Sequence, residues 1–331
     1  MDLSTTYLGF RLPHPIMPGA SPLVDDTGTV KRLEDAGAPM IVMHSLFEEQ
    51  LTGEALAMAA CAETPAESFA EATTYLASPP DHAIGPDEYL DLVRRIKRAV
   101  AVPVVASLNG ATEGGWLEYA RLMEEAGADA LEMNVYELAA DPFESGAQVE
   151  NRLIRVLKAV KDGLRIPVAV KLSPYFSSLG HMARRLEEAG ADGLILFNRF
   201  YQPDLDVENL EVSRTLRLSD RRELPLRLRW LAMLSSKRRL SLAASGGVHG
   251  AQEVIKAVMT GAHAVQIVSA LLRHGPERLA AIQKDLAAWL EEHEYESLAQ
   301  MRGSMNLARC PDPKAFARAN YMQILQSWSI W

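Results

Sequence analysis

Two short turns near the C-terminus have the composition of a phosphate-binding site. Gly246-Gly247 follows an apolar run and opens a helical pattern, and Ser269-Ala270 follows the next apolar run in the same way. Turns of this kind leave backbone N–H groups free for an anion, and a helix N-terminus adds positive potential. A dinucleotide-binding motif is not indicated, because the segment lies late in the chain and lacks GxGxxG spacing. The alternative is that both are ordinary tight turns. Because the two turns follow neighbouring strands in the same way, together they predict a phosphate site.

A lysine ends another apolar run, in PVAVKLSP, and asparagines follow three more. Lys171 is costly inside a buried strand unless it meets an anion or an electron-rich ligand. Asn109, Asn134 and Asn198 are expected near it, as is Ser107, its equivalent in the repeat described below. Amide groups pair a donor with an acceptor, which suits planar rings such as flavins and pyrimidines. Each asparagine alone could simply bond loop backbone, but together with the lysine they favour a ligand site.

These residues share one position in a repeated strand-and-helix unit. In one pattern a helix ends in Gly-Ala and a short apolar strand follows, at Gly37, Gly127, Gly190 and Gly261, where glycine is expected to adopt the left-handed conformation that ends a helix. In the other pattern the strand usually follows proline, as in VPVVASLNG and IPVAVKLSP. The two patterns alternate through four pairs, which predicts an α/β fold, a single (β/α)8 TIM barrel with its active site where the strands end. We expect the strands near residues 15–18, 39–43, 103–107, 129–133, 167–171, 193–197, 241–245 and 263–267.

Two long loops and a tail add to the barrel, which we place at about residues 12–293 of a single domain spanning 1–331. The loop after strand two contains a helical stretch at Glu48–Ala60, and the loop after strand six includes LEVSRTLRLSD, which alternates like a hairpin. Long loops on this face of a barrel usually cover the site or contact the ligand. Residues 294–331 predict a helical tail that packs on the barrel or on a second subunit, and we expect a homodimer.

The composition argues against several classes of partner. The net charge is -9 and no dense Lys/Arg block occurs, which disfavours nucleic-acid binding. The 2 cysteines are far apart and form no CxxC, which disfavours an iron–sulfur or zinc site, so no metal is expected. Neither a signal peptide nor an apolar run of membrane-spanning length is evident. We therefore expect a cytoplasmic protein with no membrane partner.

Over roughly residues 1–310 the chain resembles the dihydroorotate dehydrogenase family of FMN-dependent barrels. The resemblance rests on PIMPGAS, LEMN, VAVKLSP, GLILFN and, most specifically, SGGV with GAHAVQIVSAL followed by HGP. It implies that FMN is the cofactor and that the Lys171 ammonium stabilises the negative charge that the ring gains on reduction. The residues that it implies against the cofactor are Ala20, Ser21, His44, Ser45, Asn109, Asn134, Lys171, Gly246, Gly247, Ser269 and Ala270.

The positions that would recognise the substrate depart from the family pattern. After strand four the family has NxSCPN or NxSSPN with Cys or Ser as the base, whereas this chain has Glu137 at that place, preceded by Tyr136. Glu137 could act as the base and Tyr136 as an acid or donor, or both could be ordinary loop residues. After strand six Arg199 follows Asn198, where it could clamp a carboxylate or carry a solvated charge. The asparagine of the family's NSMGLPN loop has no counterpart in TYLASPPDHAIG.

We interpret the chain as an FMN-dependent oxidoreductase that acts on CH–CH bonds of a small planar or carboxylated substrate. Its electrons would pass to an acceptor that the sequence does not identify, such as a separate redox protein. Dihydroorotate itself, and with it a role in pyrimidine biosynthesis, stays open because the substrate residues differ. Two alternatives are a phosphate-binding lyase or isomerase without flavin and a flavin-binding subunit that has lost catalysis. A flavin barrel that reduces tRNA is disfavoured by the acidic charge.

Overall fold

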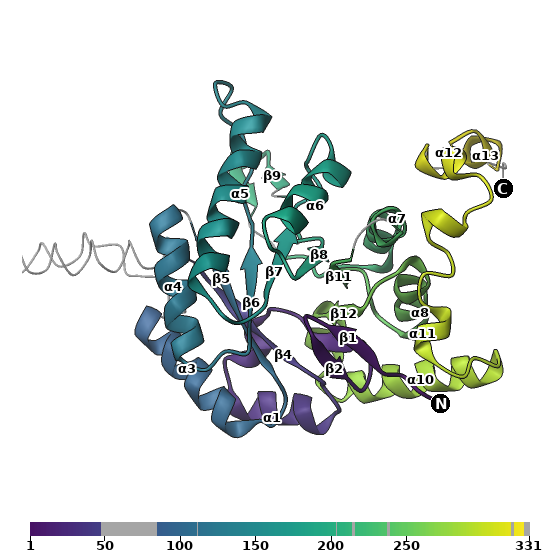
Figure 1. The fold of residues 1–331 in the computed structure, drawn as a ribbon, viewed down its shortest axis with the longest axis horizontal. Coiled ribbons are helices and arrows are strands. Elements are labelled where there is room, and N and C mark those ends of the chain that lie inside the picture. Colours follow the sequence, from purple (N-terminus) through teal and green to yellow (C-terminus); the bar gives the residue numbers. More distant parts are fainter. Residues whose placement is uncertain are drawn as a thin grey trace, which may run out of the picture.

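The computed structural model describes residues 1–47, 85–110, 112–202, 204–213, 216–236, 239–318 and 321–327. Within these ranges, eight parallel strands form one sheet in the order β3-β12-β11-β8-β7-β6-β5-β4. Strands β3 and β4 at the two ends of that order also contact each other, so the sheet curls into a nearly closed barrel (Figure 1). The predicted (β/α)8 TIM barrel is confirmed. The strands are β3 Ile16–Pro18, β4 Ile41–Phe47, β5 Val104–Asn109, β6 Ala130–Asn134, β7 Val168–Leu172, β8 Gly193–Leu196, β11 Ser241–Ser245 and β12 Ala264–Ile267.

Helices surround the strands on the outside of the barrel (Figure 1). Several begin at a side chain that accepts a backbone N–H, as Asp26 does before α1 and Ser145 does before α5. The barrel helices are α1 Thr27–Asp35, α3 Pro86–Ala99, α4 Glu113–Glu125, α5 Gly146–Gly163, α6 Leu179–Glu188, α7 Leu224–Ser235, α8 Ala251–Thr260, α9 Ser269–His274 and α10 Arg278–Glu292, with short 3₁₀ helices η1 Pro22–Val24 and η3 Arg221–Glu223.

The Gly-Ala pairs end helices as expected. Gly37, Gly127, Gly190 and Gly261 have φ angles of 95°, 98°, 97° and 114°, in the left-handed region that other residues avoid. Each reverses the chain from a helix into the next strand, so this pattern fixes where four of the barrel strands begin.

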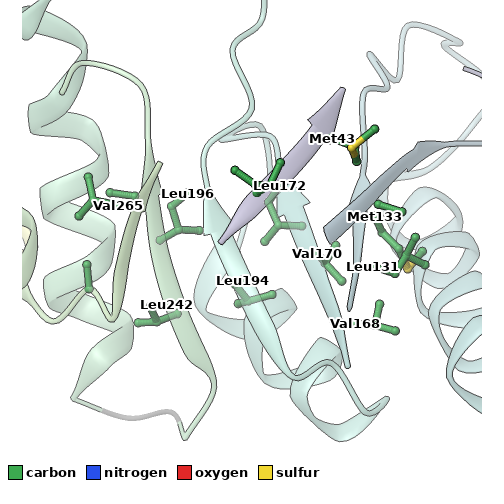
Figure 2. Close-up of a cluster of buried hydrophobic side chains, with 14 of the residues drawn as sticks. Met43, Leu131, Met133, Val168, Val170, Leu172, Leu194, Leu196, Leu242 and Val265 are labelled. Atoms are coloured by element: carbon green, nitrogen blue, oxygen red, sulfur yellow. The ribbon is translucent and has the colours of Figure 1, made fainter. Parts of the chain in front are cut away.

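The core has two concentric layers, because side chains alternate between the two faces of each strand. Figure 2 shows part of the outer layer, where residues such as Leu131, Val170 and Leu194 point from the strands toward the helices. The alternate residues, such as Ala130, Ala169 and Ile195, form a smaller cluster inside the barrel. Both layers are almost completely buried.

A hairpin closes the N-terminal end of the barrel. Its strands β1 (Thr5–Tyr7) and β2 (Phe10–Leu12) pair antiparallel, and Tyr7, Leu8 and Leu12 join the inner cluster. The Leu8 N–H donates to Oγ of Ser241 at 3.0 Å, at the start of β11. The hairpin thus covers the N-terminal end of the barrel, and the polar strand ends lie at the opposite, C-terminal mouth.

Several predicted boundaries were wrong. Strands two and three were expected to end at 43 and 107, but β4 and β5 continue to Phe47 and Asn109, because the upper half of each strand is polar on its inner face. The hairpin in the loop after β8 is made of β9 (Asp204–Asp206) and β10 (Glu211–Ser213), so it starts earlier than LEVSRTLRLSD.

The predictions for the tail and for the loop after β4 have different outcomes. The tail contains α11 Leu298–Met301, η4 Leu307–Arg309, α12 Pro313–Ala317 and α13 Tyr321–Gln326, so the predicted helical tail is confirmed. Its first part packs on the barrel, because the N–H groups of Gly303 and Met305 donate to carbonyls of α8. The helical stretch expected at Glu48–Ala60 lies outside the described residues. No helix in the described ranges has the length and apolar character needed to cross a membrane.

Candidate active site

The inside of the barrel changes from apolar to polar halfway along the strands. Alternation places every second residue of a strand on the inner face. Toward the N-terminal end of the strands, which we call the lower level, this face carries apolar residues. Two positions further along the same strands, at the upper level, it carries polar residues, and both sets are buried. The lower residues are Val105, Ala130, Ala169, Ala243 and Ala264, and the upper ones are Ser107, Glu132, Lys171, Ser245 and Gln266.

Lys171 points into the barrel and belongs to a buried ionic group. Its Nζ lies 3.0 Å from Oε1 of Glu132, and Nε2 of Gln266 donates to Oε2 of the same carboxylate at 2.7 Å. Both carboxylate oxygens therefore have a partner, as a buried charge requires. Burial raises the pKa of the Tyr7 hydroxyl below this group, and the charge of Glu132 raises it further. The sequence analysis found Lys171 but missed Glu132 and Gln266.

One hydrogen-bonded chain runs across the mouth through five residues that the sequence analysis named. Oγ of Ser45 lies 2.7 Å from Oγ of Ser107, and the amide of Asn134 donates to Ser45 at 2.8 Å. The amide of Asn198 in turn donates to Oδ1 of Asn134, and the backbone N–H of Arg199 donates to Oδ1 of Asn198 at 2.9 Å. The strand ends of β4, β5, β6 and β8 thus hold their polar side chains in one row.

The two predicted phosphate turns lie side by side. Gly246 and Gly247 have φ angles of 94° and 79°, and Ser269 is the first residue of α9. Ser219 joins the turns, because its N–H and its hydroxyl contact Oγ of Ser269 at 3.0 and 2.9 Å while its Oγ accepts the Gly247 N–H at 3.4 Å. Helix α8 begins only at Ala251, so the glycine pair precedes the helix rather than opening it. No feature of the sequence pointed to Ser219.

The end of β3 lies on the remaining side of the mouth. Ala20 packs on the inner cluster, and Oγ of Ser21 is buried without a hydrogen-bond partner among the described residues. Oε1 of Gln266 is also buried and unpartnered within them. A Cβ added to Gly19 would lie 2.9 Å from the Val268 side chain, so the turn packs tightly on β12. Asn109 is buried at the end of β5, as expected.

His44 does not join the row of polar side chains. Its Nδ1 lies 2.6 Å from Oδ1 of Asp25, and its ring stands edge-on to Tyr89, with centroids 5.1 Å apart. Burial lowers the pKa of His44, and the charge of Asp25 opposes that shift. Adjacent Ser45 points into the mouth because the register of β4 against β5 shifts between Val42 and Ser45.

Glu137 and Tyr136 lie on the exposed loop after β6. The Glu137 carboxylate is 45 % exposed and forms an ion pair with Arg152, which also binds Glu144. Tyr136 stacks on Phe200 with ring centroids 4.4 Å apart, so the loops after β6 and β8 meet through aromatic rings. The structure packs Tyr136 against Phe200 in the loop after β8 and turns Glu137 toward Arg152.

Arg199 is engaged by its own surroundings. Its Nε lies 3.3 Å from Oε1 of Glu223, its guanidinium stands 5.2 Å from the centre of the Tyr201 ring, and it donates to the backbone carbonyl of Arg217. In the part of the chain that the structure describes, no cluster of three or more His, Cys, Asp or Glu side chains could hold a metal ion.

The family model of dihydroorotate dehydrogenase matches residues 2–290 of the chain. The catalytic subunit of dihydroorotate dehydrogenase B (NAD(+)) from Thermoplasma volcanium is 26% identical over 320 residues, which cover 91% of this chain and 98% of the relative. The subunit of the same name from Anoxybacillus flavithermus is 30% identical over 210 residues, covering 61% and 66%. The NAD-dependent dihydropyrimidine dehydrogenase subunit PreA of Escherichia coli K12 is 22% identical over 330 residues, covering 92% and 77%. The chain therefore belongs to the dihydroorotate dehydrogenase family of flavin-dependent oxidoreductases.

Proposed function

We propose that this oxidoreductase binds FMN at the mouth of the barrel and acts on a CH–CH bond of a small planar or carboxylated molecule. The observation that carries the proposal is the buried polar level of the barrel, with Lys171 paired to Glu132 at its centre. A fold needs no such charges in its core, and they are expensive to bury. The family membership favours this function over the lyase or isomerase alternative.

The residues fit FMN in two ways. Oγ of Ser21 and Oε1 of Gln266 are buried polar atoms that still need partners, and the polar edge of a flavin ring can supply both donors and acceptors. Gly246 and Gly247 have positive φ angles that glycine adopts without strain, which allows a tight turn whose backbone can approach a phosphate. Ser219 and Ser269 add hydroxyl groups beside them. We propose that Ala20, Asn109, Ser45 and Asn134 contact the rest of the cofactor.

When bound, FMN would supply the capacity to take up a hydride from the substrate and to pass its electrons on. The contribution of the chain is electrostatic. Glu132, which is itself held by Gln266, fixes the Lys171 ammonium in the buried mouth, where it can oppose negative charge without reorganising. The hydrogen-bonded row from Ser107 to Asn198 likewise holds its hydroxyl and amide groups in fixed orientations at the mouth.

We propose that the loops after β6 and β8 provide the substrate residues. Glu137 is the candidate base and Tyr136 the candidate acid, while Asn198 and Arg199 are candidates for holding the substrate. For Glu137 to act, the loop must exchange the ion pair with Arg152 for a contact with the substrate. The contact of His44 with Asp25 links β4 to the segment after β3, and we propose that it supports this side of the cofactor site without touching the cofactor.

We propose that the electron acceptor is a separate redox protein, since all three relatives compared above are named as subunits. The homodimer, the cytoplasmic location and the division into a barrel and a tail stay predictions. A flavin-binding subunit without catalysis remains the alternative for the function.

The absorption spectrum of the purified protein tests the proposal. A flavin spectrum, with FMN identified after release from the protein, is expected. Bleaching of that spectrum by a small metabolite under anaerobic conditions would distinguish an active enzyme from a subunit that has lost catalysis. A colourless protein that does not take up added FMN would overturn the proposal.

A further inference from the structure

A buried arginine lies against the first of the two phosphate turns. Arg227 of α7 is only 6% exposed, and it is not among the residues proposed above to contact the cofactor or the substrate. Its Nε donates to the backbone carbonyl of Ser245 at 2.9 Å, and its Nη1 donates to the carbonyl of Glu223 at 2.7 Å. Burying a guanidinium is costly unless its charge is compensated, and two neutral carbonyls compensate it only in part.

The bond to Ser245 fixes the orientation of one peptide group of the turn. Ser245 ends β11, and its carbonyl belongs to the same trans peptide as the N–H of Gly246. In a planar trans peptide the C=O and the N–H point in opposite directions. The Gly246 N–H therefore points away from Arg227, and it has no hydrogen bond to a carbonyl among the described residues. The arginine thus holds a free donor of the turn in a fixed orientation.

Gly246 and Arg227 also fit each other sterically. A Cβ added to Gly246 would lie 2.9 Å from Nη2 of Arg227 and 3.3 Å from its Cζ, so the guanidinium fills the space that a side chain would need. The positive φ of Gly246, 94°, is a second reason for glycine at this position. The arginine and the glycine therefore form one packed unit at the end of β11.

The charges around Arg227 do not balance. Within the described residues, Glu223 is the one carboxylate in contact with Arg227, at 3.6 Å, and it is shared with Arg199, whose Nε lies 3.3 Å away. Two guanidinium groups thus face one carboxylate, which leaves one positive charge in excess beside the turn. Burial lowers the pKa of Arg227, the Glu223 carboxylate opposes that shift, and the charge of Arg199 adds to it. An anion bound nearby would relieve both the burial and the repulsion.

We propose that Arg227 is a positioning residue of the phosphate turn and makes the site selective for a flavin that carries a phosphate. It aims the Gly246 N–H by holding the Ser245 carbonyl, and its charge favours an anion at the turn. This inference rests on the proposed function, because it assigns a specificity role within the same cofactor site. The preference for FMN over riboflavin should therefore depend on a residue that does not touch the flavin ring.

A purely structural role is the alternative. Arg227 joins the start of α7 to the end of β11, so its loss could simply loosen the barrel at this place. Loosening would weaken the binding of both flavins alike, because they share the ring and the ribityl chain. Loss of a phosphate-directed role would weaken the binding of FMN alone.

Titrations of the whole chain with FMN and with riboflavin, followed by flavin fluorescence, separate these two roles. In wild type FMN should bind at least about tenfold more tightly than riboflavin, since hydrogen bonds to charged groups are the stronger ones. Arg227→Gln should lose most of that preference. Arg227→Lys should keep part of it, because an ammonium retains the charge and a donor but cannot reproduce the planar guanidinium fork. Arg229→Gln, which removes an exposed arginine from the same helix, is the matched control and should leave the preference intact.

Glu223→Gln provides a second test that damage to the fold cannot imitate. The variant keeps the backbone carbonyl that Arg227 uses and removes the negative charge that the two arginines share. FMN should then bind several-fold more tightly while the affinity for riboflavin stays unchanged.

The inference is overturned if wild type binds both flavins equally, if Arg227→Gln keeps the preference or weakens both flavins alike, or if Glu223→Gln fails to tighten FMN. A chain that takes up neither flavin would overturn the proposed function as well. FMN binding whose preference over riboflavin does not depend on Arg227 would overturn the inference alone and leave the proposed function standing.

Discussion

The ammonium nitrogen of Lys171 lies 3.0 Å from Oε1 of Glu132, and the two side chains are only 8% and 1% exposed. A buried pair of this kind contributes little net stability, but the loss of one partner leaves the other charge uncompensated. The pair therefore has a clear signature in stability measurements.

Lys171→Met should lower the free energy of unfolding by about 3–5 kcal/mol, because Glu132 would stay buried without its cation. The double variant Lys171→Met/Glu132→Leu should recover most of that loss. Urea unfolding of both variants and of wild type measures the difference. Equal stability of the single and the double variant would show that the two groups do not compensate each other.

Gly247→Ala should destabilise the protein more than Gly9→Ala and should weaken FMN binding. Both glycines have positive φ, 79° and 85°, so a side chain costs about 1–2 kcal/mol at either place. Only at Gly247 would the new Cβ also meet backbone, 2.6 Å from the nitrogen of Leu224, whereas nothing lies within 4 Å at Gly9. Gly247→Asp should in addition repel the phosphate.

Thermal unfolding and titrations with FMN and with riboflavin measure these effects. A phosphate role predicts that the Gly247 variants lose FMN affinity more than riboflavin affinity. If Gly247→Asp binds FMN as tightly as wild type, the phosphate site lies elsewhere.

Glu137→Gln should slow flavin reduction by the true substrate by about 10²–10⁴-fold if Glu137 is the base. Glu144→Gln is the matched control, because both carboxylates bind Arg152 and only one is expected to reach the substrate. Rapid-mixing absorbance at saturating substrate measures both rates. Equal effects in the two variants would assign Glu137 a structural role through Arg152.

Dihydroorotate should be a poor substrate even though it carries a carboxylate. A site that lacks the polar partners of a ring loses roughly 10⁴-fold or more in rate constant. The NSMGLPN asparagine, the second asparagine of NxSCPN and its Cys or Ser base are absent from their expected places in this sequence. Glu137 would also bring a carboxylate near that of the substrate. Flavin reduction by dihydroorotate at roughly 1–10³ s⁻¹, the usual range of turnover, would show that the altered residues still recognise it.

Stability should fall as the pH drops from about 6.5 to about 4, with His263 as one cause. Burial lowers the pKa of His263 to about 4, and the nearby charge of Arg302 lowers it further. Between pH about 6.5 and about 4, His263 binds a proton in the unfolded chain but stays neutral in the folded chain. The free energy of unfolding therefore falls as the pH drops through this range, by about 3 kcal/mol in total. Below pH 4 both states are protonated and this contribution levels off.

His263→Asn removes the titrating ring and keeps an acceptor for the N–H of Leu242, which Nδ1 of His263 now accepts at 3.1 Å. Urea unfolding at pH 7 and at pH 5 should show a smaller loss for this variant than for wild type. The same loss in both would exclude His263 as a contributor.

The sequence allowed the barrel to be predicted because its repeat is local. Each Gly-Ala pair ends a helix through its own φ angle, so the start of the following strand could be read directly. Strand ends were harder to place, because apolar character was the criterion and the upper inner positions are polar. Ser45 and Asn109 therefore looked like loop residues although they lie within β4 and β5.

The site was only partly predictable for related reasons. Lys171 was recognised because a charge within an apolar strand needs a partner, and the same reasoning applied to Glu132 in ALEMN and Gln266 in AVQI would have found the rest of the group. Ser219 and Arg227 gave no such signal, since each stands in a polar or arginine-rich stretch. Their roles depend on contacts with residues 18–50 positions away, which only the folded chain brings together.

The hairpin at the base of the barrel has a consequence for the order in which the chain can fold. Thr5 donates to the carbonyl of His263, Leu8 to the hydroxyl of Ser241, and Arg302 donates to Thr5. These three bonds join residues that are 258, 233 and 297 positions apart in the chain. Loop closure over such separations is costly in entropy and is repaid only when both ends are present. During synthesis, Tyr7 and Leu12 therefore lack their native packing contacts until β12, the last barrel strand, has been made.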